Sequence, residues 1–468
     1  MKPALILINP WIYDFAAFDL WSKPLGLLFI AGYLRERGFR IHVIDCLSRH
    51  HPGMKADKSV FLSHRHAFGT GKFHRDQVPK PPPLRHVARP FSRYGISREL
   101  FVHDLKRIED PAAILVTSLM TYWYLGVNEV IALARDIHPG VPVLLGGIYA
   151  TLCRDHAMSF SGADRVIGGT GLHAMASVID DLRRSGIEGD IEALPLGGPL
   201  GGPLGGSRGR PEGGIPYPAF DLLYDTTYVC LLTSSGCPFQ CRYCASHFLN
   251  PKFIKRDPMG IVEEILYWHD RYKVRDFAFY DDALLIGFHS HLNIILEELV
   301  RRDLKLRFHT PNALHLREIT LEIARLLYLS GFRTIRLGLE TSDMNQHRDL
   351  DEKVSEGEFE KAVGHLRAAG FSKKEIGAYI LMGLPGQSVG SVLETVEFVG
   401  RLGATPYLAE YSPIPHTPMW EKALEHSEYA LGAEPLFHNN TLLPCWDASQ
   451  RARVPELKKR VQAFREEP

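Results

Sequence analysis

Short apolar runs alternate with helical patterns through the first 185 residues of the chain. The apolar runs are expected to be buried strands, at Ala4–Ile8, Arg40–Ile44, Ala113–Ser118, Val141–Leu145 and Arg165–Ile167. Amphipathic helical patterns separate them, at 25–37, at 127–137 and after residue 171. This alternation is typical of a parallel sheet covered by helices on both faces. We therefore predict an α/β, doubly wound domain over residues 1–185, with a ligand crevice at the carboxyl ends of its strands.

The same alternation resumes between residues 215 and 417, as six strand–helix units. The expected strands are Tyr228–Thr233, Asp276–Tyr280, Lys305–His309, Thr334–Leu339, Glu375–Leu381 and Pro406–Tyr411. The expected helices are Met259–Tyr272, His291–Arg302, Ile319–Ser330, Glu358–Ala369 and Val389–Arg401. Six such units predict a partial (β/α)6 barrel with functional groups at the carboxyl ends of its strands. Residues 418–468 are expected to form a helical extension.

Two segments interrupt these patterns. Residues 50–98 are rich in His and Pro, and a loop of this length inside a compact domain is uncommon. We predict a surface insertion that caps the crevice between the domains. Metal binding by its histidines is a less favoured alternative because they are widely spaced. Residues 186–214 contain a Pro-Leu-Gly-Gly repeat, which predicts a flexible linker with no chemistry of its own.

Charge and hydropathy exclude several kinds of partner. The chain has 54 Lys and Arg residues against 54 Asp and Glu residues, so no overall field attracts nucleic acid or a membrane. No apolar run approaches the ~20 residues that a membrane-spanning helix needs. The apolar start of the chain is too short for a secretion signal. We predict a cytoplasmic protein without a membrane span and without a nucleic-acid partner.

Three cysteines carry the most specific chemistry. Cys237, Cys241 and Cys244 have the spacing C-x3-C-x2-C and follow the first strand of the predicted barrel. Three thiolates on one loop can bind three irons of a [4Fe–4S] cluster and leave the fourth iron open. A zinc site with His247 as fourth ligand is the weaker alternative. Because the other four cysteines are isolated, a disulfide framework is weaker still.

These cysteines, with Tyr243 just before the last of them, resemble the signature of the radical S-adenosylmethionine (SAM) superfamily. The resemblance implies that the open iron binds the amino and carboxylate groups of SAM. Electron transfer then yields a 5′-deoxyadenosyl radical, and Tyr243 lies near the adenine. The resemblance also implies an external electron donor such as flavodoxin or ferredoxin.

Polar and glycine residues follow the other predicted barrel strands at the positions where radical SAM relatives bind SAM. The expected SAM contacts are Asp281, Asp282, His309, Glu340, Thr341, Met382 and Gly383. An acidic pair suits an ammonium group, which needs acceptors. Glu340 could bind the ribose hydroxyls or the amino group, or could only offset a helix dipole. His309 could instead support the site by hydrogen bonding.

The first domain resembles the Rossmann-like cobalamin-binding domain that precedes many radical SAM barrels. The residues that carry this resemblance are Asn9, Pro10, Gly26, Asp45, Ser118, Gly146 and Gly147. Glycines let the backbone approach a bulky cofactor closely. The chain has no Asp-x-His-x-x-Gly motif to supply an axial His to cobalt. A Rossmann-like domain without cobalamin therefore stays open as an alternative.

Together, the two resemblances imply a radical SAM enzyme with a [4Fe–4S] cluster, SAM and cobalamin. Such an enzyme would modify, and by family tendency methylate, an unactivated carbon of a small-molecule substrate. Two alternatives stay open at this point. One is a radical SAM enzyme without cobalamin, and the other is a non-enzymatic regulator that holds zinc or an iron–sulfur cluster in its cysteines.

Overall fold

The computed structural model describes residues 2–56, 67–187 and 216–466. The chain divides into two compact units, residues 1–229 and residues 230–468. Nearly all of the segment predicted as a linker lies outside the described residues. Among the described helices, none combines the length and the apolar character that crossing a bilayer requires.

A five-stranded parallel sheet forms the centre of the first unit. Its strands are β1 (Ala4–Asn9), β4 (Arg40–Asp45), β8 (Pro111–Val116), β9 (Val143–Leu145) and β10 (Arg165–Val166). They lie in the order β10-β9-β8-β1-β4 and pair in parallel. From β1 the chain adds β4 on one side, and it then adds β8, β9 and β10 on the other. Because this switch in strand order lies between β1 and β8, ligands are expected beyond the carboxyl ends of these two strands. This order confirms the predicted doubly wound domain.

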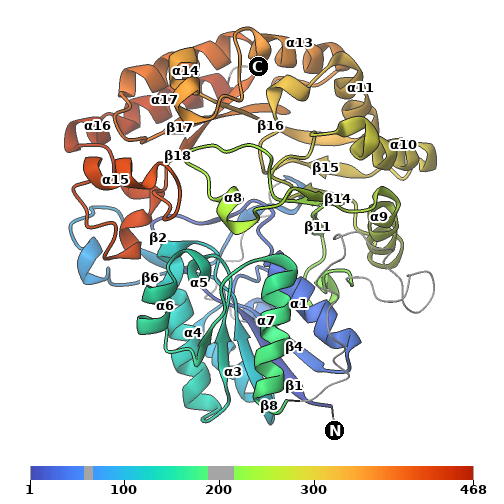
Figure 1. The fold of residues 1–468 in the computed structure, drawn as a ribbon, viewed down its shortest axis with the longest axis vertical. Coiled ribbons are helices and arrows are strands. Elements are labelled where there is room, and N and C mark those ends of the chain that lie inside the picture. Colours follow the sequence, from blue (N-terminus) through green and yellow to red (C-terminus); the bar gives the residue numbers. More distant parts are fainter. Residues whose placement is uncertain (1, 57–66, 188–215, 467–468) are drawn as a thin grey trace. The chain divides into compact units, whose positions relative to one another are not determined.

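Helices cover both faces of this sheet. Its helices are α1 (Leu25–Glu36), α3 (Arg98–Lys106), α4 (Tyr124–Ile137), α5 (Ile148–Leu152), α6 (Arg154–Phe160) and α7 (Gly171–Arg184). Figure 1 shows α1 and α7 over one face, where their apolar residues pack with Leu5, Leu7 and Leu115 in one core cluster. Side chains alternate along a strand, so Ile6 and Ile8, fully buried, point to the opposite face.

The described part of the 50–98 insertion forms small antiparallel sheets with the residues that follow β1. Strand β7 (Ser92–Tyr94) pairs with β2 (Ile12–Asp14) on one side and β6 (Arg75–Gln77) on the other. Strand β3 (Phe18–Asp19) pairs with β5 (Gly71–Lys72). His51 and His74 bond to separate carboxylates, Asp104 at 2.8 Å and Asp76 at 3.1 Å. His51 thus ties the insertion to α3, whereas His74 bonds within the insertion, to β6.

Six strands form the sheet of the second unit, in chain order. They are β11 (Tyr228–Leu231), β14 (Asp276–Phe279), β15 (Arg307–His309), β16 (Phe332–Glu340), β17 (Ile376–Met382) and β18 (Thr405–Glu410). Between them run α9 (Pro258–Tyr272), α10 (Leu292–Arg302), α11 (Leu321–Ser330), α13 (Glu358–Ala369) and α14 (Val389–Arg401). Figure 1 shows α10, α11, α13 and α14 in an arc outside the strands. The sequential order confirms the predicted partial barrel.

The terminal helix α17 (Val454–Glu466) packs against the last strand, β18, and against α14. Arg460 on α17 pairs with Glu397 on α14. Gly400 permits this packing because any side chain there would collide with the ring of Phe464. An uncovered edge strand invites pairing with other chains, so the helix protects β18. Between them, α15 (Trp420–His426) and α16 (Ala448–Ala452) complete the extension.

Candidate functional site

The loop that carries the three cysteines begins in a short antiparallel pair after β11. Strand β12 (Ser234–Ser235) pairs with β13 (Ile254–Lys255). Gly236 follows with a φ of 76°, and a Cβ there would lie 2.8 Å from the carbonyl oxygen of Asn250. Glycine is required on both counts, because other residues avoid positive φ and none fits this close approach. The turn delivers Cys237 to the carboxyl end of the sheet.

The three thiols share one electrostatic environment. Cys241 is buried, Cys237 and Cys244 are half-buried, and none forms a disulfide. Burial raises the pKa of Cys241 to about 11, while the ammonium of Lys353 acts to lower it. Cys237 and Cys244 interact with each other, as do Cys241 and Cys244.

This donor set fits an iron–sulfur cluster. Three free thiols with one cation beside them can become thiolates when iron binds. Within the described residues, no three His, Cys, Asp or Glu side chains converge as the ligands of one metal ion would. The thiolates of a cubane bind different irons, so they lie farther apart than the ligands of a single ion.

Asp281, directly after β14, fixes the start of the cysteine loop. Its carboxylate accepts hydrogen bonds from the backbone and hydroxyl groups of Thr233 and Ser234, at 2.6–3.1 Å. These bonds occupy the carboxylate, which is fully buried. Asp281 therefore orients the loop, a task that the sequence analysis did not foresee.

Asp282 lies closer to the cysteines. One carboxylate oxygen accepts a 2.8 Å bond from the hydroxyl of Ser246, at the start of α8 (Ser246–Leu249). Burial raises the pKa of Asp282, and Lys353 acts against this shift. The carboxylate also raises the pKa of Cys237. Of the acidic pair, Asp282 is thus the one with acceptor capacity left beside the cysteines.

Glu340 ends β16 in an unusual backbone conformation. Its φ is 65°, and the pairing of β16 with β17 shifts register between Gly338 and Glu340. A positive φ is rare for a residue with a long side chain and is often found at functional sites. Burial raises the pKa of the Glu340 carboxyl, and Lys353 acts to lower it.

Lys353 is the cation around which this part of the site is organised. Its ammonium donates to the hydroxyl of Tyr243 at 3.2 Å and also to the thiol of Cys241. Burial alone would lower the pKa of Lys353, but Glu340, Cys241 and Asp351 raise it above its usual value. The ammonium thus interacts with the carboxyl groups of Glu340 and Asp351 and with the thiol of Cys241.

Asp351 holds Lys353 in position. One of its carboxylate oxygens accepts the backbone N–H of Lys353 at 3.1 Å and contacts the ring of His347 at 3.1 Å. The other ring nitrogen of His347 donates to the carbonyl oxygen of Thr341 at 2.8 Å. The loop after β16 is therefore one hydrogen-bonded unit, from Thr341 through α12 (Met344–Leu350) to Lys353.

The glycine turn after β17 is tightly held. Met382 is fully buried, and Gly383 has a φ of 92°. The side chain of Gln387 accepts the N–H of Gly383 at 2.9 Å and donates to the carbonyl of Leu381 at 2.9 Å. Leu443 of the extension packs over the turn. The sequence predicts SAM contacts at Met382 and Gly383, and this turn is rigid.

His309 lies at the end of β15 but has no free ring nitrogen. One nitrogen contacts Thr334 and the other contacts Asp276, both at 3.1 Å. Asp276 also accepts two bonds from Arg307. The supporting role is therefore the one that the structure favours for His309.

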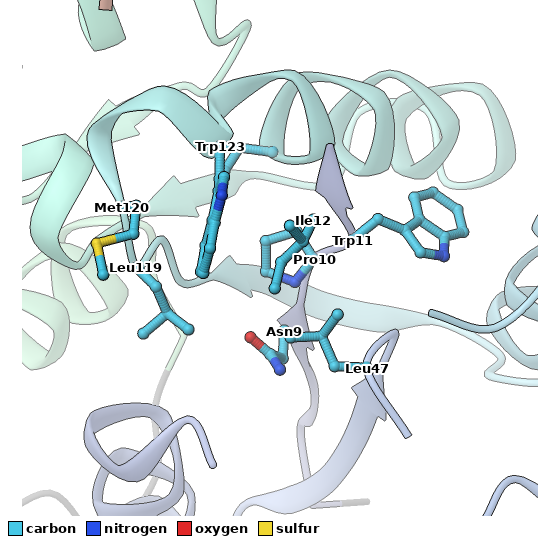
Figure 2. Close-up of a pocket in the computed structure, with 9 residues that line it drawn as sticks. Asn9, Pro10, Trp11, Ile12, Leu47, Leu119, Met120 and Trp123 are labelled. Atoms are coloured by element: carbon cyan, nitrogen blue, oxygen red, sulfur yellow. The ribbon is translucent and has the colours of Figure 1, made fainter. Parts of the chain in front are cut away.

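In the first unit, a pocket lies at the carboxyl ends of β1 and β8. Its empty space, including the open solvent at its mouth, is about 250 Å³. Its lining is Asn9, Pro10, Trp11, Ile12, Leu47, Leu119, Met120, Trp123 and Val127. In Figure 2 the amide oxygen of Asn9 points toward the space between Leu119 and Trp123. This oxygen is buried and has no hydrogen-bond partner among the described residues, whereas the amide nitrogen donates to Asp45 at 2.7 Å.

Some of the other predicted cofactor residues of this unit are held by contacts between loops, and others have open space beside them. The hydroxyl of Ser118 donates to the carbonyl of Gly146 at 2.7 Å, which ties together the loops after β8 and β9. Gly147 has a φ of 95°, and a side chain there would strike the backbone of Ser118. Gly26 lies in the first turn of α1, and a Cβ added there would have no atom within 4 Å. The structure thus brings Asn9 and Pro10 into one pocket and gives Ser118 and Gly147 a loop-bracing role.

Three further residues near the cysteines did not stand out in the sequence. Lys353 and Asp351 belong to a charged run that resembles a solvated surface, and His315 follows a strand end without a motif. Their importance depends on contacts between segments about 70 to 110 residues apart, such as that of Lys353 with Tyr243. A lysine soon after the Gly-x-Glu segment is the only local hint.

Comparison with protein families decides the identity of the second unit. The family model described as the Radical SAM superfamily matches residues 231–399. The match contains the three cysteines, Tyr243, Glu340 and Lys353. Residues 231–399 form a radical SAM domain. The predicted [4Fe–4S] cluster and SAM are the cofactors of that superfamily, and the recognition made from the cysteine spacing is confirmed.

The curated relatives of this chain are distant. An uncharacterized methyltransferase of Pyrococcus horikoshii is 23% identical over 360 residues, which cover 71% of this chain and 74% of the relative. The cytidylyl-2-hydroxyethylphosphonate methyltransferase of Streptomyces wedmorensis is 23% identical over 442 residues, covering 84% and 75%.

Solved structures confirm the fold of the chain. The radical SAM methyltransferase TsrM of Kitasatospora setae, with tryptophan and a SAM analogue bound, has a TM-score of 0.65 at 16% identity. The match covers 99% of this chain and 89% of TsrM. The cobalamin-dependent SAM radical enzyme OxsB has a TM-score of 0.55 at 12% identity, covering 99% of this chain and 56% of OxsB.

Proposed function

We propose that this protein is a cobalamin-dependent radical SAM enzyme that methylates an unactivated carbon of a small molecule. The observation that carries the proposal is the grouping of three free thiols with Lys353 at the carboxyl end of a six-stranded sheet. When bound, the cluster supplies the electron that cleaves SAM, and cobalamin supplies the methyl group.

The residues around the cysteines suit the polar groups of SAM. Asp282 offers an acceptor to the amino group, and the ammonium of Lys353 offers a partner to the carboxylate. Glu340, buried at the end of β16, can accept hydrogen bonds from the ribose hydroxyls. The apolar cluster of Leu381, Leu384 and Tyr411, against which Tyr243 packs, provides a dry wall for the adenine.

Cobalamin fits the first unit as the occupant of the Asn9 pocket. The pocket lies at the switch point of the sheet, where doubly wound domains bind ligands. Its free amide oxygen can accept a hydrogen bond from one of the amide groups around the corrin ring. A pocket of this size would hold only one edge of the cofactor. A solved structure of TsrM contains both cobalamin and a [4Fe–4S] cluster, which supports the assignment.

The substrate class and the partners follow from the same reasoning. TsrM binds tryptophan and the Streptomyces relative is named for a phosphonate nucleotide, so we propose a small-molecule substrate here. An external donor such as flavodoxin or ferredoxin would reduce the cluster. A cytoplasmic location is proposed because a reducing compartment protects such a cluster.

Substitution at Gly26 tests the cobalamin assignment. Gly26→Ala should leave the fold intact or stabilise it by about 0.5–1 kcal/mol, because alanine is the better helix former and nothing lies within 4 Å. The larger Gly26→Phe should reduce cobalamin retention, since glycine there leaves room for a bulky ligand. The measurement is cobalt absorbance after gel filtration of protein reconstituted with hydroxocobalamin.

The matched control for this test is Gly364→Phe on α13, where a Cβ also meets nothing within 4 Å. It should retain cobalamin as the unmodified protein does. Equal retention by the Gly26→Phe protein would remove Gly26 from the site. Failure of the unmodified protein to retain cobalamin would favour a radical SAM enzyme without it.

A further inference from the structure

His315 lies beside the cysteine loop and takes no part in the contacts described so far. It follows β15 and precedes a 3-10 turn, Leu316–Glu318. Its ring centroid lies 4.2 Å from that of Phe239, which sits between Cys237 and Cys241. The neighbouring Leu314 bonds to β16 through Arg336 at 2.7 Å and Gly338 at 3.2 Å, so the backbone fixes the position of the ring.

One ring nitrogen of His315 is buried and unused. The residue is 9% exposed, and Nε2 has no hydrogen-bond partner among the described residues. The backbone carbonyl of Asp282 acts on the ring as a hydrogen-bond acceptor and Nε2 has no partner, so we assign the ring proton to Nδ1 and the lone pair to Nε2. Burial lowers the pKa of His315 to about 3, with Lys353 adding to the effect, so the ring is neutral.

A buried acceptor without a partner is uncommon and costs stability until a donor reaches it. The other acceptors at this end of β14 are largely occupied. Asp281 accepts bonds from Thr233 and Ser234, most of them at Oδ1, and Asp282 has one oxygen bound by Ser246. The ammonium of Lys353 donates to Tyr243 and Cys241 and not to Nε2 of His315. The lone pair of Nε2 of His315 is therefore available to a hydrogen-bond donor of a ligand.

We propose that Nε2 of His315 accepts a hydrogen bond from the amino group of SAM and, with Asp282, positions its methionine part against the cluster. This inference rests on the proposed binding of SAM to the cluster, and it is independent of cobalamin and of the reaction that follows. An amino group bound to iron still carries N–H donors, and a neutral imidazole beside it accepts one without adding charge.

Two substitutions remove the lone pair of Nε2, one by losing the ring and the other by losing both ring nitrogens. His315→Asn keeps an amide near the position of Nδ1, where it can still donate to Asp282, but has no atom at Nε2. His315→Phe keeps the ring against Phe239 and loses both nitrogens. His315→Gln can place an amide oxygen where Nε2 was and should restore the acceptor. His269→Gln on α9, a half-buried histidine outside the site, is the control.

The measurement is the SAM concentration that half-completes the change in the EPR spectrum of the reduced cluster. Loss of this buried hydrogen bond, which leaves an N–H of the amino group without an acceptor, should weaken SAM binding by roughly 10- to 100-fold in the Asn and Phe variants. The Gln variant should stay within a few-fold of the unmodified protein. A SAM analogue that lacks the amino group should bind the Asn variant and the unmodified protein equally.

Iron content shows whether each variant carries the cluster. If either the Asn or the Phe variant fails to assemble it, the other still tests the proposal. Unchanged SAM affinity in either assembled variant would overturn the proposal. Equal weakening of SAM and of the amine-free analogue would also overturn it, because that result reveals a packing role. Absence of any SAM effect in the unmodified protein would instead refute the proposed function.

Discussion

Serine in place of Cys241 abolishes the iron–sulfur cluster, and with it every response to SAM. This expected result follows from the donor set, because two remaining thiolates cannot hold the irons of a cubane that is already one protein ligand short. Cys241 is also the buried thiol that Lys353 bonds. Iron content should fall from about four per chain to background, and the visible absorption of the cluster should disappear.

Cys153→Ser is the matched control for this substitution. Cys153 is a half-buried free thiol of the first unit and takes part in no expected ligation. The control should keep both iron and absorption. A Cys241→Ser protein that still binds about four irons per chain would contradict the assignment of the cluster to this loop. One tightly bound zinc per chain in the unmodified protein would favour the zinc alternative.

Methionine in place of Lys353 should destabilise the second unit and make its cluster harder to reduce. The side chain is half-buried, so leaving Glu340 and Asp351 without their shared cation should cost about 2–3 kcal/mol, less than for a fully buried pair. Loss of a positive charge beside Cys241 should shift the reduction potential of the cluster to a more negative value. Urea unfolding and an EPR-monitored redox titration measure the two effects.

Two variants separate charge from packing in this test. Lys353→Arg keeps the cation and should lie between the unmodified protein and the Met variant in both measurements. Lys374→Met removes an exposed lysine in the turn before β17 and should change neither. An unchanged potential in the Met variant would contradict the electrostatic role of Lys353 toward the cluster.

The sequence predicted the main strands and helices well because their patterns are local. Buried parallel strands such as β1 and β8 are continuous apolar runs, and the helices between them carry amphipathic repeats. The small strands of the 50–98 insertion were missed for the opposite reason. Two- and three-residue strands such as β5 and β7 are too short to show a period, and long-range pairing alone defines them.

The candidate site was predicted only where a motif or a strand end marked it. The spacing of Cys237, Cys241 and Cys244 predicts a cluster loop from sequence alone. The task of Asp281 could not be predicted, because its five hydrogen bonds come from residues 47 and 48 positions away. Lys353 and His315 gain their roles from burial beside that loop, which the residues around them in the sequence do not encode.

The most direct test of the account is whether the protein cleaves SAM at its cluster. Full-length protein would be reconstituted anaerobically with iron, sulfide and hydroxocobalamin, reduced in the presence of SAM, and assayed by chromatography for 5′-deoxyadenosine. The account predicts deoxyadenosine from the unmodified protein and none from the Cys241→Ser variant. Absence of deoxyadenosine from protein with a verified [4Fe–4S] cluster, both alone and with candidate substrates supplied, would contradict it.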